Sequence, residues 1–181
     1  MRPTPRPLAA RGRGGLSLLE LIFAMVVIVV AAALAIPLAR SLFTARVAAE
    51  TVAQQIVRDM KRARALAVIN AATNPEGYEI RFRGPQDDYD EYVMVQLGDS
   101  SLVPPARALG AGASGSTEVQ CGSAIGASSF VFRPVGNVEV ENASGGAVSG
   151  DPVLSVEQGP VRFDITLARA TGHAEAVAVE P

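Results

Sequence analysis

The chain has 181 residues, a length that fits one modest domain with an appendage. Its 16 basic and 18 acidic side chains give a net charge of −2, so the whole chain is close to neutral. The single cysteine excludes an intramolecular disulfide, and one cysteine with one histidine excludes a zinc site built from these two residue types.

The first 15 residues form a basic leader that contains four arginines and no acidic residue. Residues 21–39 then carry no formal charge, and a helix needs about 20 such residues to cross a bilayer. Because arginines that flank an apolar span stay on the cytoplasmic side, we expect the remainder of the chain outside the membrane. Without the four leader arginines, 12 basic residues would remain against 18 acidic ones, a net charge of −6.

One carboxylate, Glu20, lies at the start of the apolar run. An ionisable group at membrane depth is a functional candidate by default and needs a partner. The alternative is that its side chain simply extends to the lipid headgroups.

Three interpretations of this N-terminus are open. A secretory signal peptide fits the basic leader and the small residues at 31–35, although the apolar run is longer than usual for such a signal. A plain membrane anchor also fits, but it gives Glu20 no role.

The third interpretation comes from a resemblance. Gly15, then "LSLLE", then an apolar helix resembles the class III signal of type IV pilins and pseudopilins. The resemblance implies that a prepilin peptidase cuts between Gly15 and Leu16, methylates the new N-terminus and leaves the helix intact. Glu20 becomes the fifth mature residue, where the family has its assembly glutamate, and Pro37 becomes the twenty-second, where many members have proline. Leu16 departs from the commoner Phe or Met of the first mature position. The implied cut creates an amino group at Leu16, about 6 Å from Glu20 along a helix axis. Glu20 would then pair with its own Leu16 amine or with that of a neighbouring copy.

The helical pattern continues beyond the apolar run. Pro37 is expected to kink the helix without ending it. Asn74, Pro75 and Gly77 are expected to end it. Between these points, apolar residues recur on one helix face at Val52, Ile56, Met60, Ala63 and Ala67. The charged residues among them, at 58, 59, 61, 62 and 64, are expected on a solvated or groove-lining flank.

After Gly77 the apolar period changes from helical to two, which predicts strands. Residues 78–83 and 93–97 are expected to form a hairpin across "GPQDDYD". Residues 98–129 are rich in Gly, Ala, Ser and Pro and are expected to form a long loop. Further strands are expected at 130–132, 138–140, 153–156, 161–167 and 175–179. A long helix followed by antiparallel strands is an α+β fold, in which the sheet buries one helix face.

Three segments also resemble the GspH/FimT branch of pilin-like proteins: "MKRARALAVINAA" with Arg64, Ala65 and Ala67, "FRPVGNV" with a Phe-x-Pro-x-Gly turn, and "VRFDITLARATGHAEAV" with a Thr-Gly turn. The resemblance implies a pilin-like fold with four parts. These are a leader peptide at 1–15, a transmembrane and filament-core helix at 16–39, an amphipathic continuation at 40–74 and a periplasmic β-rich domain at 75–181.

The function that this resemblance implies is that of a minor pilin or pseudopilin. Such a subunit is held in the inner membrane by one span and then joins a type IV pilus or a type II secretion pseudopilus, at its initiating tip. The implied partners are the prepilin peptidase, other minor pilins, the major pilin and the assembly platform protein. Two alternatives stay open: a DNA-binding minor pilin, and a soluble periplasmic protein released by signal-peptide cleavage.

No residue pattern prompts a catalytic, cofactor or metal assignment, so we expect no enzyme activity and no cofactor. His173 is expected in a surface turn, without a nucleophile beside it. The acidic residues at 86–91 lack EF-hand spacing and are expected to form a solvated loop, with calcium binding as the alternative. Cys121 has no basic neighbour in the sequence and is expected to be inert. Some FimT-like minor pilins bind DNA through arginines after the Thr-Gly turn, and the resemblance places that position at residues 172–181, which contain no Arg or Lys. The acidic remainder of the chain also argues against nucleic acid as a partner, because phosphate binding depends on clustered cations.

Overall fold

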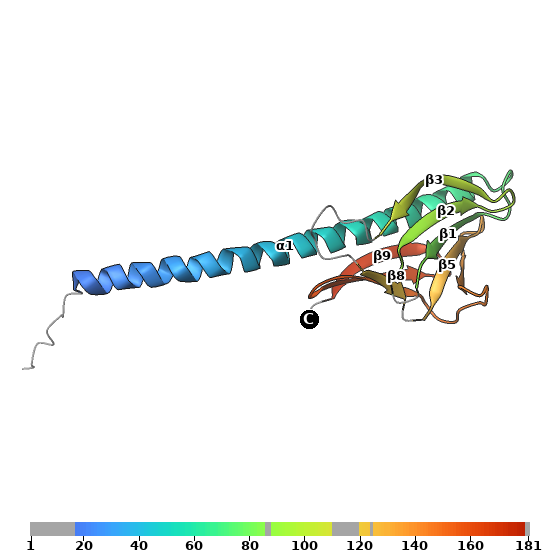
Figure 1. Ribbon diagram of the computed structural model, residues 1–181. Helices are drawn as coiled ribbons and strands as arrows, with labels where there is room; N and C mark the ends of the chain where they lie inside the picture. Colours follow the sequence, from blue (N-terminus) through green and yellow to red (C-terminus); the bar gives the residue numbers. More distant parts are fainter. Residues whose placement is uncertain (1–16, 86–87, 110–119, 124, 180–181) are drawn as a thin grey trace, which may run out of the picture. The chain divides into compact units, whose positions relative to one another are not determined.

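The computed structural model describes residues 17–85, 88–109, 120–123 and 125–179. The chain divides into two compact units, Met1–Arg40 and Ser41–Pro181. In the described residues, one helix, α1 (Leu18–Ile69), precedes nine strands in two antiparallel sheets (Figure 1). The expected α+β class is therefore confirmed.

The strands of the second unit form a five-stranded sheet in the order β3-β2-β1-β5-β6 and a four-stranded sheet in the order β4-β7-β8-β9. Every pair of neighbouring strands is antiparallel. The first sheet comprises β1 (Tyr78–Arg83), β2 (Glu91–Gln96), β3 (Ser101–Ala108), β5 (Ala127–Phe132) and β6 (Val138–Asn142). The second comprises β4 (Gln120–Ser123), β7 (Val153–Gln158), β8 (Val161–Ala168) and β9 (His173–Val179).

One face of α1 is buried in the core of the second unit. Ile56, Met60, Ala63 and Ala67 are fully buried, as their spacing predicts, and Val52 is half-buried. Phe130 of the first sheet and Leu167 of the second belong to the same buried cluster. The helix and both sheets therefore share one core, and in Figure 1 this part of α1 runs along the strands.

The helix ends close to the predicted breakers. Asn74 accepts a backbone hydrogen bond from Gly77, and its side-chain amide donates to the Gly77 carbonyl at 2.6 Å. Gly77 has a φ of +89°, and a Cβ at this position would run into the carbonyl oxygen of Phe132. Glycine is thus required where the chain turns from the helix into β1.

The predicted hairpin is confirmed, because β1 and β2 pair in register from Tyr78↔Gln96 to Arg83↔Glu91. The connection between them is anchored at Tyr89, which is buried and donates its hydroxyl proton to the Ala127 carbonyl at 2.8 Å. Gln86 and Asp87, part of the candidate calcium loop, lie outside the described residues.

The expectation of a loop throughout residues 98–129 is wrong, because this segment contains β3, β4 and the start of β5. Pro104 and Pro105 discouraged a strand assignment because proline cannot donate a ladder hydrogen bond. They are tolerated because β3 is an edge strand, and its register with β2 shifts at this point. The Gly- and Ser-rich β4 lacks an alternating apolar pattern and is also an edge strand.

The five later strands are confirmed within a few residues of their predicted limits. Their predicted turns are also present: the Gly136 N–H donates to the Arg133 carbonyl at 2.9 Å, and the Gly172 N–H donates to the Ala168 carbonyl at 2.7 Å. His173 is a small correction, because it is the exposed first residue of β9, paired with Ala168, and not part of the turn.

Candidate functional site: the exposed apolar part of the helix

Ser17 caps the N-terminus of α1. The backbone N–H of Glu20 donates to Ser17 Oγ at 3.2 Å and to the Ser17 carbonyl at 3.0 Å. Ser-x-x-Glu is the sequence signature of a capping box, and a carboxylate in the first turn also interacts favourably with the helix dipole. The cap depends on the Ser17 side chain and the Glu20 backbone, and the sequence analysis missed it although its signal is local.

The apolar segment Leu18–Ile36 has a mean hydropathy of 2.9 and is long enough to cross a membrane. None of it is buried within the structure, and Leu18 and Leu19 are nearly four-fifths exposed. A segment of this kind near an N-terminus either spans a membrane or serves as a secretory signal. Glu20 is the only charged residue between positions 17 and 39, and its side chain is exposed.

The other predicted site residues have different outcomes. Gly15 and Leu16 lie outside the described residues, so the cleavage site and the pairing of the Leu16 amine with Glu20 stay predictions. Pro37 lies inside α1, which continues through it as expected. The kink at Pro37 also stays a prediction.

Three segments that are distant in the sequence meet at Gly172. A Cβ at Gly172 would lie 3.1 Å from Arg64 Cδ and 3.2 Å from the Gly136 carbonyl oxygen. It would also lie 3.2 Å from Val138 Cγ2. We call these four residues the glycine junction. They come from the helix end, the β5–β6 turn and the β8–β9 turn, the same three segments that resemble the GspH/FimT branch.

The expected flank for Asp59 was solvated or groove-lining, and the solvated alternative is wrong because Asp59 is buried. Its Oδ2 accepts hydrogen bonds from the Tyr92 hydroxyl and from Arg107 Nε, both at 2.7 Å. Burial, together with the bond to Asp59, raises the pKa of Tyr92 far above its ordinary value. This clamp ties α1 to β2 and β3 and so helps to hold the helix against the first sheet.

Three cations of α1 differ from several arginines of the strands and turns in their ion pairing. Arg58, Lys61 and Arg62 are exposed, and no described carboxylate lies within ion-pair distance of them. By contrast, a carboxylate pairs with each of five arginines beyond the helix: Arg81, Arg83, Arg107, Arg133 and Arg162. The free cations therefore form a basic strip on the solvent side of the helix.

The single cysteine and the single histidine lie in different surroundings. Cys121 lies in β4 and is buried, which raises the pKa of its thiol to about 12 and makes the thiolate scarce at neutral pH. His173 is exposed at the start of β9. Among the residues that the structure describes, no three His, Cys, Asp or Glu side chains are grouped to hold a metal. The absence of a metal, a cofactor and an enzyme activity stays a prediction.

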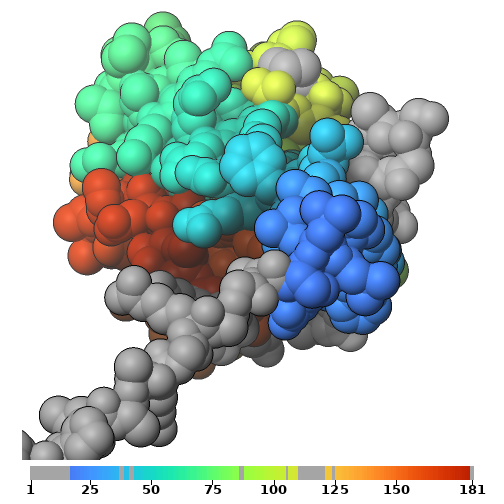
Figure 2. Space-filling model, turned by 90° about the vertical axis from the view of Figure 1, so that its left-hand side faces the viewer, coloured from blue at the N-terminus to red at the C-terminus, as the bar shows by residue number. Residues whose placement is uncertain are grey.

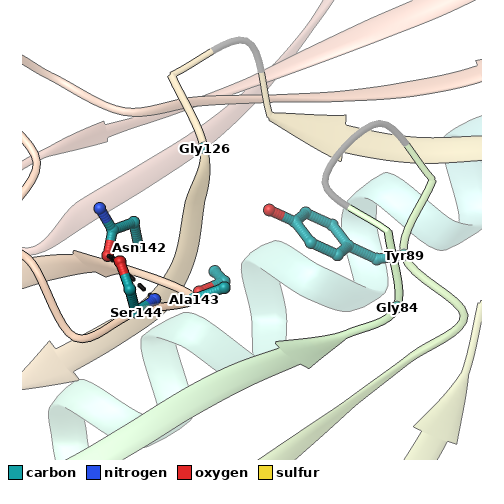
Figure 3. Close-up of a pocket in the computed structure, with 7 residues that line it drawn as sticks. Gly84, Tyr89, Gly126, Asn142, Ala143 and Ser144 are labelled. Atoms are coloured by element: carbon teal, nitrogen blue, oxygen red, sulfur yellow. Dashed lines mark hydrogen bonds between the residues drawn. The ribbon is translucent and has the colours of Figure 1, made fainter.

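A hollow of about 390 Å³ lies between the β1–β2 connection, the start of β5 and the end of β6 (Figure 3). Its labelled residues are Gly84, Tyr89, Gly126, Asn142, Ala143 and Ser144. The Asn142 side-chain oxygen accepts hydrogen bonds from the Ser144 N–H at 3.1 Å and hydroxyl at 2.8 Å, which shapes the turn after β6. The described lining includes no charged side chain.

Comparisons with protein-family models, with curated proteins and with solved structures find no match to this chain. Its function must therefore be inferred from three features of its own: the exposed apolar segment, the Ser17–Glu20 cap and the glycine junction.

Proposed function

We propose that the chain is a minor subunit of a pilin-like filament, either a type IV pilus or the pseudopilus of a type II secretion system. The observation that carries the proposal is that Leu18–Ile36 is exposed and apolar, yet belongs to the same helix as the buried face around Met60. A large exposed apolar surface marks a site for a membrane or a partner. A filament subunit needs both, lipid before assembly and neighbouring helices afterwards.

The leader and the junction support the same proposal. The four arginines of residues 1–15 favour a cytoplasmic leader and a periplasmic second unit, anchored in the inner membrane by one span. In this account a prepilin peptidase removes the leader after Gly15 and methylates Leu16. The glycine junction gives a packing reason for the small and turn residues that resemble the GspH/FimT branch.

Glu20 sets the register of assembly in this proposal. An unpaired carboxylate and an unpaired amine are both costly in an apolar environment, and pairing them relieves both costs. The Glu20 carboxylate of an incoming subunit therefore pairs with the Leu16 amine of a neighbour displaced along the filament. The partners are the major pilin, other minor pilins at the initiating tip and the assembly platform protein in the membrane.

The test of this role compares two glutamates of the same helix. Glu50 is exposed and lies outside the apolar segment, so Glu50→Ala is a matched control for Glu20→Ala. We expect Glu20→Ala to be processed and retained in the membrane but missing from sheared filament fractions, whereas Glu50→Ala is incorporated normally. Incorporation of Glu20→Ala at the wild-type level would contradict the pairing.

A second candidate function, binding of duplex DNA by the filament, is favoured by the basic strip of Arg58, Lys61 and Arg62. Affinity for DNA falls as salt rises, and each phosphate contact should steepen the plot of log affinity against log salt concentration by about 0.9. A gel-shift series with the wild-type chain and the triple alanine variant measures this slope. Salt-dependent binding that is lost in the variant supports DNA binding, and no shift at low salt excludes it.

A further inference from the structure

The four sheet edges differ in how far they are open to another strand. An edge strand presents unpaired N–H and C=O groups, and proteins usually hinder pairing there with prolines, bulges, covering loops or short strands. The first sheet ends in β3 and β6, and the second ends in β4 and β9.

Three of these edges carry such a feature. β3 contains Pro104 and Pro105 and has an irregular register with β2. The outer edge of β6 is covered by the residues that follow it, because the Val148 N–H donates to the Val140 carbonyl at 2.9 Å and Glu141 pairs with Ala147. β4 has only four residues.

The outer edge of β9 has none of these features. All seven residues pair with β8 in an unbroken register, from Ala168↔His173 to Arg162↔Val179, and the strand contains neither Pro nor Lys. No described strand pairs with its other side. Val177 is 50% exposed and Val179 is 40% exposed. In Figure 2 the red C-terminal strands lie at the surface beside the teal helix.

We propose that this edge of β9 docks an extended segment of a neighbouring, different filament subunit. A segment in a strand conformation can pair with the whole row of N–H and C=O groups along the edge, a mode of recognition known as β-augmentation. Glu175 is the only acidic side chain of β9, so the segment that fits carries a basic or neutral residue opposite it and β-branched residues opposite the two valines. The identity of the partner as a filament subunit rests on the proposed function.

A second copy of the chain fits this edge less well. If β9 pairs with its own copy in full antiparallel register, Glu175 lies opposite Val177 of the copy and diagonal to the Glu175 of the copy, which is unfavourable for like charges. The other three edges of the copy are hindered by the features described above. The repulsion between the two Glu175 side chains and the hindered edges of a second copy therefore favour a different chain as the segment that pairs with β9.

The experiment places a photo-crosslinking amino acid at Val179 of the full chain in cells that make the filament. A probe at Val135, which is 88% exposed in the β5–β6 turn, is the control for exposure alone. Two proline variants, Ala176→Pro and Val177→Pro, test the edge itself, because successive N–H groups of a strand point to opposite sides. One proline removes a donor from the free edge and the other removes one from the β8 ladder. Val177→Lys keeps every N–H but adds an edge charge that hinders pairing.

We expect the Val179 probe, and not the Val135 probe, to give a discrete adduct with a different chain. The free-edge proline should keep the wild-type melting temperature and lower the adduct yield about tenfold, as the loss of one good contact would. The proline on the β8 side should lower the melting temperature, and Val177→Lys should lower the adduct yield in a folded chain. The proposal is overturned if the Val179 probe gives no adduct, or if the adduct consists of two copies of this chain. It is also overturned if Val177→Lys and the folded proline variant both give the wild-type adduct yield.

The N-terminal mass of the same sample separates this proposal from the proposed function. A chain that begins at Leu16 and gives no adduct refutes the edge proposal alone. A chain that has lost the apolar segment refutes the filament function, and with it the identity of the docked partner.

Discussion

The two parts of α1 have the same secondary structure and opposite relations to solvent. In residues 18–36 every side chain is exposed, although nearly all are apolar. In residues 49–67 the apolar side chains are buried every three or four positions, and the face between them carries Arg58, Lys61 and Arg62. The chain itself covers the second set and leaves the first uncovered.

This difference shows where a partner is needed. Burial of a Leu, Ile, Val or Phe side chain contributes about 1.5–3 kcal/mol, so the second part of α1 obtains its stability from the sheets. The first part obtains none from the described residues, and in the proposed function its surroundings are lipid or other chains. The exposed carboxylate of Glu20 lies in this uncovered part of the helix.

The largest expected effect comes from a charge in the middle of the apolar part. Val27→Asp places a second carboxylate near the centre of the expected span, at a cost of about 2.5–3.5 kcal/mol on insertion scales. We expect this variant to be lost from the membrane fraction after alkaline extraction, whereas Val27→Leu is retained. Retention of Val27→Asp would show that the two parts of α1 do not differ in their surroundings.

The next effect is on the buried face. Ile56 is fully buried and Ile69 is 76% exposed, so the same change to alanine tests the contrast within one helix. Ile56→Ala should lower the free energy of unfolding by about 2–5 kcal/mol. Ile69→Ala should change it by less than about 0.5 kcal/mol. Urea unfolding of the full chain in detergent measures both, and equal losses would contradict the assigned helix face.

A smaller effect is expected at the clamp on Asp59. Arg107→Met leaves this buried carboxylate with the Tyr92 hydroxyl alone and should lower the free energy of unfolding by about 1–3 kcal/mol. Arg83→Met removes an exposed pair with Glu91 and should cost about 0–1 kcal/mol. The same unfolding assay compares them, and a larger loss at Arg83 would refute the clamp.

The smallest perturbation is chemical labelling of Cys121. Its raised thiol pKa means that the thiolate fraction at pH 8 is far below that of a free cysteine, so alkylation should be about a hundredfold slower or more. The rate should recover when urea opens the second unit, which makes Cys121 a reporter of that unit alone. Rapid alkylation without denaturant would mean that β4 does not stay folded against the core.

Local patterns predicted much of this molecule. The helix face, the β1–β2 hairpin and the later strands follow from apolar spacing, and Ser17 with Glu20 carried a capping signal that was overlooked. What the sequence did not reveal depends on distant residues. Asp59 is buried because Tyr92 and Arg107 reach it from β2 and β3, and β3 tolerates its prolines because it is an edge strand.

The glycine junction has the same origin. The sequence predicts turns at Thr171-Gly172 and at 132–138, but the approach of Arg64, Gly136 and Val138 to Gly172 arises only when the helix and both sheets pack together. Such contacts have no periodic signal in the chain, since they join segments that are far apart in the sequence.

The central claim is that the apolar part of α1 remains attached to the working protein. The mass of the intact chain recovered from membranes, with its N-terminal fragment sequenced, tests this claim most directly. We predict a chain that begins at Leu16, carries one added methyl group and retains Glu20. A chain that begins at Ile36 or later would have lost that glutamate and the exposed segment, and it would contradict the account.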